Sequence, residues 1–516
     1  MNMDTLSSSH GVAMGARALA ALPPAHDDTP HLHHFLVGTS IAQDKENQIH
    51  VYEYNEDTNT LAEVIVYDHP HEIVSITTSH ALQDKAFTCY YVDPSSSSSH
   101  SHSSGNTRSD VDAWYAPDTA IALWSIPRSH DAKAAESDAE AEAEAEDKSD
   151  VVRGQGDDHG RRSKERGIDL RSGKTKGRRL RQILQLGSVP FEASIFDQLP
   201  MSLCKGYSPA SPFELLWNME STAVSSPPSA TLPGDATLLT LHYGGIATWQ
   251  LDRGVSTISC LGHSNVPLTS PITCGAWDPH RPQTFAATAN GTTLRLWDIR
   301  GASIEPAGIV SAAHSGVIAS VDFNPNKPHH LATGGADGLV YVWDLRKTTT
   351  PVLTLQGHYN AVNTVRHNRF HDQLLLTSGA DGAVNLWNAL STSSVPSGGG
   401  STVNDMAFGA STADLTSHSV AIGPGYGGPT TPGATGTSPT TPAGSAPADR
   451  SAKGTAAHSA AEKDSDRLIR RYTDFDESVL GLTWSRVHAW VFASLSVDGR
   501  FQVTQVPPAE KYRILL

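Results

Sequence analysis

The chain has 516 residues, of which 38% are hydrophobic and 18% charged, and its formal net charge is −16. This acidic balance argues against a large nucleic-acid-binding face, because such faces concentrate Lys and Arg. No apolar run approaches the roughly 20 residues that cross a bilayer, and residues 1–21 lack the basic start of a secretory signal. The four cysteines form no CxxC pair and indicate no disulfide framework, so we expect a reduced, cytosolic compartment.

The N-terminal half holds three degenerate predicted units of β-strands. Residues 1–30 form an N-terminal segment that we expect to supply a ring-closing strand, within residues 11–22. The first unit covers residues 35–68, and the second runs from residue 71 to Trp124. The third runs from residue 178 to 252 and contains Trp217 and Trp249; splitting it would give an eighth unit, but no clear Asp-Gly turn favours the split.

A clear repeat follows in the centre of the chain. Three segments that begin at Cys274, Ala319 and Asn363 align without gaps. Their final tryptophans, Trp297, Trp343 and Trp387, are 46 and 44 residues apart, which is close to the WD40 period. Each segment alternates short apolar runs with turns, and two carry Asp-Gly between apolar runs, which indicates a hairpin. A further copy starts at Leu480, so the sequence predicts an all-β fold: a seven-bladed WD40 β-propeller formed by residues 31–516 as a single domain.

Three inserts interrupt this predicted propeller, at about residues 94–113, 128–178 and 390–466. They are rich in Ser and His, in alternating Ala and Glu followed by basic residues, and in Gly, Ser, Thr and Pro. Such compositions cannot bury enough apolar surface to fold, so we expect long disordered inserts. The acidic run 131–150 and the basic run 153–181 carry equal and opposite charge, so the acidity belongs mostly to the propeller. Residues 161–181 could bind acidic partners or anionic lipid, but a solvated linker is the preferred interpretation.

Two central units contain the same His, Thr, Asp and Trp at the same offsets. A hydroxyl, an imidazole and a carboxylate resemble a nucleophilic catalytic set. Because a catalytic site is needed once and this set recurs, we interpret it as a structural hydrogen-bond network within each blade. The last unit keeps only Ser and Asp. The predicted network residues are His314, Thr333, Asp337 and Trp343; His358, Thr377, Asp381 and Trp387; and Ser494 and Asp498.

Other motifs give weaker functional hypotheses. Histidine is plentiful and includes His100 and His102, and the run containing His31, His33 and His34 could bind a metal weakly. No Cys or carboxylate cluster completes a tetrahedral site, so we expect solvated histidines, no metal and no cofactor. A WDxR tetrapeptide occurs twice and ends at Arg300 and Arg346. It resembles the motif with which WD40 substrate receptors dock on a cullin-RING ligase adaptor, so these arginines are candidate partner-binding residues.

Several segments between the repeats resemble one known family. They include FLVGT from Phe35, DFNPNK from Asp322, HDQLLLT from His371 and the terminal KYRILL from Lys511. In these words the chain resembles the EARP- and GARP-complex-interacting WD-repeat proteins, over essentially the whole predicted propeller. The resemblance implies a non-enzymatic adaptor for GARP/EARP-type vesicle tethers. It further implies roles in endosomal recycling, endosome-to-Golgi transport and secretory cargo sorting.

The alternative function is a WD40 substrate receptor of a cullin-RING ubiquitin ligase, and an enzyme is disfavoured. The expected partners are protein subunits of the tethering complexes, with no nucleic acid. The acidic propeller would be repelled from anionic lipid, so we expect no direct membrane insertion. The resemblance implies a cytoplasmic protein recruited peripherally to endosomes and the trans-Golgi network.

Overall fold

The structure is a computed structural model. It describes residues 7–12, 15–24, 31–41, 47–79, 82–92, 119–127, 178–187, 212–217, 236–243, 245–252, 254–264, 271–281, 284–289, 291–299, 304–310, 313–394 and 466–516. All of them belong to one compact unit, Met1–Pro396 with Ser465–Leu516. Most of the three predicted inserts lies outside the described residues.

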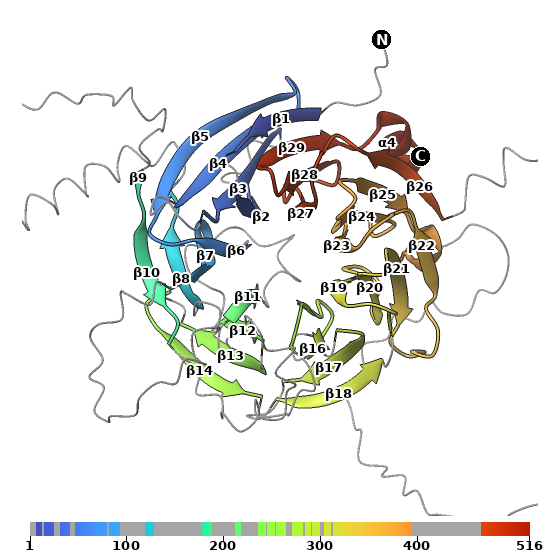
Figure 1. Cartoon of the computed structure of the whole chain (residues 1–516), viewed down its shortest axis with the longest axis horizontal. Helices are drawn as coiled ribbons and strands as arrows, with labels where there is room; N and C mark the ends of the chain where they lie inside the picture. The colour runs from blue at the N-terminus through green and yellow to red at the C-terminus, as the bar shows by residue number, and fades with distance from the viewer. Residues whose placement is uncertain are drawn as a thin grey trace, which may run out of the picture. The chain divides into compact units, whose positions relative to one another are not determined.

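The described strands form seven sheets arranged in a ring (Figure 1). The first sheet contains β2 (Ala16–Leu22), β3 (Leu32–Thr39), β4 (Asn47–Asn55), β5 (Thr60–His69) and β9 (Arg178–Arg179). The second contains β6 (Ile73–Ser79), β7 (Leu82–Tyr91), β8 (Thr119–Ser125) and β10 (Arg181–Gln185). The third contains β11 (Pro212–Trp217), β12 (Ala236–His242), β13 (Gly245–Leu251) and β14 (Ile258–His263).

The remaining sheets follow in chain order. The fourth contains β15 (Gly275–Trp277), β16 (Thr284–Ala289), β17 (Thr293–Asp298) and β18 (Glu305–Val310). The fifth contains β19 (Ile318–Phe323), β20 (His330–Gly335), β21 (Leu339–Asp344) and β22 (Leu353–Gln356). The sixth contains β23 (Val362–His367), β24 (Leu374–Gly379), β25 (Val384–Asn388) and β26 (Arg467–Tyr472). The seventh contains β27 (Val479–Trp484), β28 (Val491–Ser496), β29 (Arg500–Gln505) and β1 (Ser7–Gly11).

The expected all-β propeller is confirmed, and its core lies between neighbouring sheets. The second strands of the last three sheets, β20, β24 and β28, are buried along their whole length. Strands covered on both faces read as continuous apolar or small-residue runs, as HLATGG, LLLTSG and VFASLS do. Helix α4 (Pro508–Leu515) follows β29. No helix in the described parts of the chain is both long and apolar enough to span a membrane.

Hydroxyl groups tie the innermost strands of neighbouring sheets together. Thr77 Oγ1 of β6 donates to the Leu215 carbonyl of β11 at 3.0 Å. Thr364 Oγ1 of β23 donates to the Leu480 carbonyl of β27 at 2.8 Å. Thr273, just before β15, donates to the Ile318 carbonyl at the start of β19 at 2.8 Å. These bonds satisfy carbonyls on the inner edge of each sheet, where no further strand pairs.

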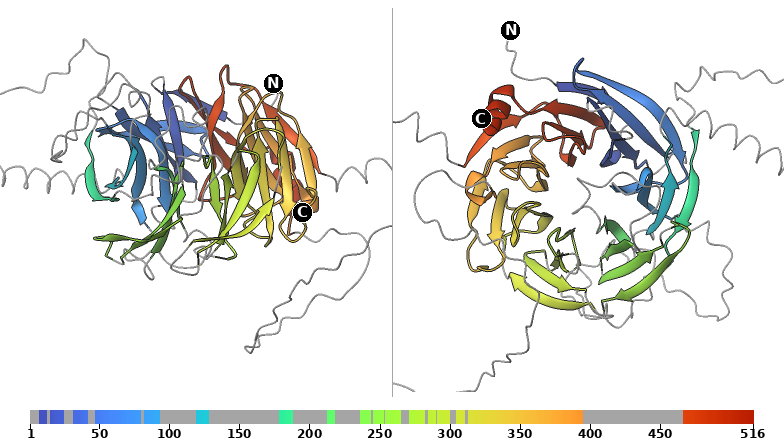
Figure 2. Two further views of the ribbon diagram at one scale, coloured as in Figure 1. Left: turned by 60° about the horizontal axis from the view of Figure 1, so that its bottom comes forward. Right: turned by 180° about the vertical axis from the view of Figure 1, so that it is seen from behind.

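The two ends of the sequence meet in the seventh sheet. Strand β1 pairs antiparallel with β29, with Ser9 opposite Gln502. The expectation that the closing strand lies within residues 11–22 is therefore wrong, because only Gly11 of that range belongs to it. Residues 16–22 instead form the innermost strand of the first sheet. In Figures 1 and 2 the blue and red strands adjoin at this closure.

The predicted third unit is also corrected. Strand β10 pairs with β8 and completes the second sheet, so the third sheet begins only at Pro212. Strand β9 adds to β5 in parallel, which makes the first sheet five-stranded and places Arg178 in a strand rather than an insert. The long gaps after β8 and after β25 thus separate the third strand of a sheet from its outermost strand. Short outer strands without Trp or Asp-Gly carry no repeat signal, which explains the error.

Candidate functional site

The predicted network of the fifth sheet is joined by hydrogen bonds. Trp343 Nε1 donates to Thr333 Oγ1 at 3.0 Å. Thr333 Oγ1 lies 2.8 Å from His314 Nε2, and His314 Nδ1 lies 3.0 Å from Asp337 Oδ1. Asp337 Oδ2 also accepts the Ser315 backbone N–H at 3.0 Å. The chain of bonds therefore runs from the buried indole to the loop that enters β19.

The sixth sheet repeats this arrangement. Trp387 Nε1 donates to Thr377 Oγ1 at 2.9 Å, and Thr377 Oγ1 lies 2.8 Å from His358 Nε2. His358 Nδ1 lies 3.0 Å from Asp381 Oδ1, and Asp381 Oδ2 accepts the Tyr359 backbone N–H at 3.0 Å. Each residue therefore makes these same hydrogen bonds in both sets and occupies the same sequence offset.

One proton arrangement satisfies each set. Because Trp Nε1–H occupies the threonine oxygen as a donor, the threonine O–H donates to His Nε2, and His Nδ1–H donates to Asp. Burial lowers the pKa of His314 and of His358, which keeps both imidazoles neutral. Burial raises the pKa of the Asp337 carboxyl, but the hydrogen bond and charge of His314 together with the backbone N–H groups of Ser315 and Leu339 outweigh burial, so the pKa lies below its usual value. All polar groups are paired within the set, as a structural network requires.

The sequence did not predict two related networks, in the second and third sheets. In the second sheet, Trp124 Nε1 donates to Thr88 Oγ1 at 2.7 Å, and Thr88 Oγ1 lies 3.1 Å from His69 Nε2. In the third sheet, Trp249 Nε1 donates to Thr240 Oγ1 at 2.9 Å, and His242 Nε2 lies 2.9 Å from the same oxygen. The spacing of nine residues from Thr240 to Trp249, against ten in the fifth and sixth sheets, was the available signal. The gap between β7 and β8 hid it in the second sheet.

The predicted pair in the seventh sheet is not joined. Ser494 Oγ donates to the Gln502 carbonyl at 3.5 Å. Asp498 instead accepts from Ser496 Oγ and from the Arg500 backbone N–H. Asp498 therefore holds its own tight turn and is not connected to Ser494 as in the fifth and sixth sheets.

The hydrogen-bonded loops expose one large aromatic side chain, Tyr359. It is 90% exposed and precedes β23, so it lies on the ring face formed by the loops that enter the inner strands. The Arg471 guanidinium lies over the Tyr359 ring, 4.6 Å from its centroid. Arg471 also donates to Asp381 Oδ2 at 2.8 Å and to the Gly357 carbonyl. The network thus anchors the cation that supports the exposed ring.

We call Tyr359, Arg471 and the loop 474–477 the Tyr359 face. The loop adjoins the Asp381 turn, because a Cβ on Gly382 would lie 2.7 Å from the Phe475 carbonyl oxygen. It carries exposed acidic side chains, including Asp476 at 85% side-chain exposure and Glu477. A rigid, exposed tyrosine beside carboxylates is a surface that can bind a partner segment carrying apolar and basic side chains.

The structure describes one of the two WDxR arginines, Arg346. Arg300 lies outside the described residues. Arg346 forms a bidentate pair with Asp344 of its own motif, through Nε at 2.9 Å and Nη2 at 2.8 Å. Its side chain is 65% exposed, but both carboxylate oxygens of Asp344 hold it along the strand end. This pair gives Arg346 a role within the chain.

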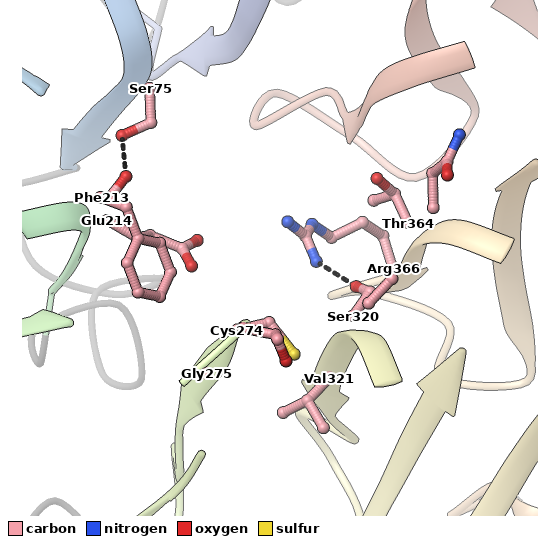
Figure 3. Close-up of a pocket in the computed structure, with 12 residues that line it drawn as sticks. Ser75, Phe213, Glu214, Cys274, Gly275, Ser320, Val321, Thr364 and Arg366 are labelled. Atoms are coloured by element: carbon pink, nitrogen blue, oxygen red, sulfur yellow. Dashed lines mark hydrogen bonds between the residues drawn. The ribbon is translucent and has the colours of Figure 1, made fainter. Parts of the chain in front are cut away.

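A cavity of about 210 Å³ lies between the inner strands of five sheets (Figure 3). The Arg366 guanidinium donates to Ser320 Oγ at 3.3 Å, and Glu214 faces it from β11. Burial raises the pKa of Glu214 to about 7, against the effect of the Arg366 charge. The cavity is smaller than usual ligand pockets, which span about 300–1,000 Å³. We find no nucleophile–base pair among the residues that line it.

Two of the histidines expected to be solvated are largely covered. His33 is fully buried in β3 and the His34 side chain is only 14% exposed, whereas the His31 side chain is 58% exposed. Burial lowers the pKa of His33. His33, Glu56 and His488 offer ligand atoms that all lie within 4.8 Å of one another. A carboxylate and a second histidine therefore gather beside His33, a grouping that the sequence did not indicate. His100 and His102 lie outside the described residues.

Comparison with known proteins gives consistent results. The family model described as the EIPR1 β-propeller matches residues 236–387. Human EARP and GARP complex-interacting protein 1 is 27% identical over 98% of both chains. The protein of the same name from Pongo abelii is 31% identical over 60% of this chain and 65% of its own. WD repeat-containing protein DWA2 of Arabidopsis thaliana is 28% identical over 52% of this chain and 60% of its own.

These relatives agree with the fold and with the resemblance seen in the sequence. The family model runs from β12 of the third sheet to β25 of the sixth, and the similarity to the human protein covers 98% of this chain. None of the three relatives is named for a ubiquitin ligase. The chain is therefore similar to the EARP- and GARP-complex-interacting proteins along nearly its whole length, and its central sheets match the EIPR1 β-propeller family model.

Proposed function

We propose that this chain is a non-enzymatic adaptor that binds GARP/EARP-type tethering complexes. The observation that carries the proposal is the similarity along 98% of the chain to a protein named for interaction with both complexes. A ring of sheets with paired loop networks provides a rigid support for such binding. The adaptor would act in endosomal recycling, endosome-to-Golgi transport and secretory cargo sorting. It would be cytoplasmic and reach endosomes and the trans-Golgi network through its protein partners.

The Tyr359 face is the surface that we assign to partner binding. Tyr and Arg supply most strong contacts in protein interfaces, and a pre-ordered ring loses little conformational entropy on binding. Here Arg471 fixes the ring, and the hydrogen bond to Asp381 fixes Arg471. The neighbouring carboxylates of the loop 474–477 select a partner segment with basic side chains.

The test is affinity purification of the tagged full-length chain from cells, with tether subunits quantified by mass spectrometry. Tyr359→Ala is expected to weaken their capture by about 30-fold, the loss of one interface hot spot of about 2 kcal/mol. Phe370→Ala is the matched control, because Phe370 follows β23 at the opposite end of the same strand and is 39% exposed. It should leave capture unchanged.

The outcomes separate the function from the surface. Absence of tether subunits with the unaltered chain would refute the adaptor proposal. Equal capture of tether subunits by Tyr359→Ala and Phe370→Ala would leave the adaptor proposal standing and would refute the Tyr359 face as the binding surface.

A further inference from the structure

A cluster of three potential metal ligands lies at the junction of the first and seventh sheets. His33 belongs to β3, Glu56 follows β4, and His488 lies in the turn between β27 and β28. Residues that are more than 430 positions apart in sequence are therefore brought together only when the ring closes. The His33 and His488 ring centroids are 4.6 Å apart and the rings are nearly perpendicular, at 82°.

His33 is oriented as metal-ligating histidines are. Its Nδ1 lies 2.6 Å from Ser485 Oγ, which also accepts the Val487 backbone N–H at 3.1 Å. With Nδ1–H donated to Ser485, the lone pair of Nε2 points toward Glu56 Oε2 at 3.7 Å. The side chain is fully buried, and Nε2 has no hydrogen-bond partner among the described residues. A buried nitrogen without a partner is costly unless a ligand occupies the space before it.

Glu56 and His488 complete the donor set. Glu56 Oε2 lies 2.5 Å from His488 Nε2, and the Glu56 backbone carbonyl accepts from Gln505 Nε2 at 3.2 Å. Lys511 Nζ lies 3.9 Å from the other carboxylate oxygen, Oε1, so Oε2 is the oxygen available to an ion. For an ion to bind His488 Nε2, the proton that Nε2 now shares with Glu56 must move to Nδ1, which would then give up the long contact of 3.4 Å from the Trp490 backbone N–H.

We propose that His33, Glu56 and His488 bind one divalent transition-metal ion of the zinc type. Two imidazole nitrogens and one carboxylate oxygen are a donor set that Zn²⁺ accepts, with water as a fourth ligand. Hard ions such as Mg²⁺ prefer oxygen ligands in larger number and do not fit a site with two nitrogens. The ion would link the first sheet to the seventh and hold the ring closed.

The test uses the full-length chain stripped with a chelator and then titrated with Zn²⁺, Mg²⁺ or Co²⁺. Zn²⁺ should bind with one equivalent per chain and, at a free concentration 100-fold above its dissociation constant, raise the Tm by about 3 °C, and Mg²⁺ should not. Co²⁺ should give the strong visible absorption of a four- or five-coordinate site. Glu56→Gln and His488→Gln should each remove the Tm shift and the absorption while the far-ultraviolet circular dichroism remains that of the folded chain.

The control addresses the histidines of the Ser-rich segment. The double variant His100→Ala/His102→Ala should keep the one-equivalent Zn²⁺ effect. Loss of the effect in this variant, an equal effect in Glu56→Gln, or no Tm shift with any ion would each overturn the proposal. If His488→Gln fails to fold, the Co²⁺ spectrum of the unaltered chain and the Glu56→Gln variant still decide between the outcomes.

Discussion

The Nδ1 atom of His358 lies 3.0 Å from Oδ1 of Asp381, and the backbone of Gly379 passes directly beside this pair. A Cβ on Gly379 would lie 2.4 Å from Asp381 Oδ1 and 2.5 Å from His358 Nδ1. Gly335 has the same relation to His314 and Asp337. The first glycine of each Gly-Ala-Asp-Gly segment is therefore required because a larger side chain would collide with the hydrogen-bonded His and Asp.

Gly379→Ala is expected to separate His358 from Asp381 and to lower the free energy of unfolding by about 3 kcal/mol. Chemical denaturation of the full-length chain measures this loss. Gly11→Ala is the control, because nothing lies within 4 Å of a Cβ at that position. A change of under about 0.5 kcal/mol is expected there. Equal stabilities for the two variants would contradict the role of Gly379.

Thr377 donates to one buried partner and accepts from another, so Thr377→Val leaves both His358 Nε2 and Trp387 Nε1 without a partner. The isosteric change keeps the packing, and we expect a loss of about 2 to 4 kcal/mol from the two unpaired groups. Thr354→Val, at an exposed position of β22, is the matched control and should change stability little. Indistinguishable unfolding midpoints would show that the network contributes nothing.

Deletion of residues 1–11 removes β1 and exposes the edge of β29. We expect the free energy of unfolding to fall by about 2 to 4 kcal/mol, since the five residue pairs with β29 are lost. The exposed edge should also promote self-association, which light scattering detects. Deletion of residues 1–6 alone, which leaves β1 intact, is the control and should behave as the full chain.

Stability should fall as the pH drops below about 6.5. Burial lowers the pKa of His69 to about 4, and it also lowers the pKa of His314 and His358. Between pH 4 and the unfolded pKa of about 6.5, the unfolded chain binds protons that the folded chain does not, so acid favours unfolding. Above pH 6.5 these histidines are neutral in the folded and the unfolded state, so they do not change the free energy of unfolding with pH.

Thermal unfolding measured from pH 8 to pH 5 tests this expectation. The Tm should be nearly constant down to about pH 7 and then decrease. His69→Gln should reduce the decrease, because it removes one of the titrating groups. A Tm that rises on acidification would contradict the assigned directions.

Helix α4 is held through a buried carboxylate. Glu510 is 5% exposed, pairs with Arg467 of β26 and accepts from Asn388 Nδ2 of β25 at 3.4 Å. Glu510→Ala should cost about 1 to 3 kcal/mol, less than a fully buried pair because the Arg467 side chain is 33% exposed. Glu477→Ala, at an exposed loop position, is the control. Similar proteolytic release of the C-terminus in both variants would refute the role of Glu510.

The sequence predicted the three inner strands of the fifth and sixth sheets well because those three strands form one continuous local repeat in each sheet. Trp343 and Trp387 end β21 and β25 near the expected places, and the intervening Asp-Gly turns have the positive φ that glycine permits, 77° at Gly338 and 67° at Gly382. All the signals lie within about 45 residues of one another. Local patterning is sufficient for such units.

Features formed by distant segments could not be predicted in this way. His33, Glu56 and His488 share no local pattern, and only ring closure brings them together. Strand β10 and its partner β8 are separated by the gap from 128 to 177. Sequence patterning therefore assigned β10 to the third sheet, whereas it belongs to the second. The exposed Tyr359 became notable only when the structure placed Arg471 against its ring.

The pairing of β1 with β29 also has a consequence for how the chain is made. Ser9 leaves the ribosome 493 residues before its partner Gln502. At synthesis rates of about 5 to 20 residues per second, β1 waits for roughly half a minute to a minute and a half before β29 exists. Throughout that time the nascent ring is open, and the first strand must stay free of other partners until the final one arrives.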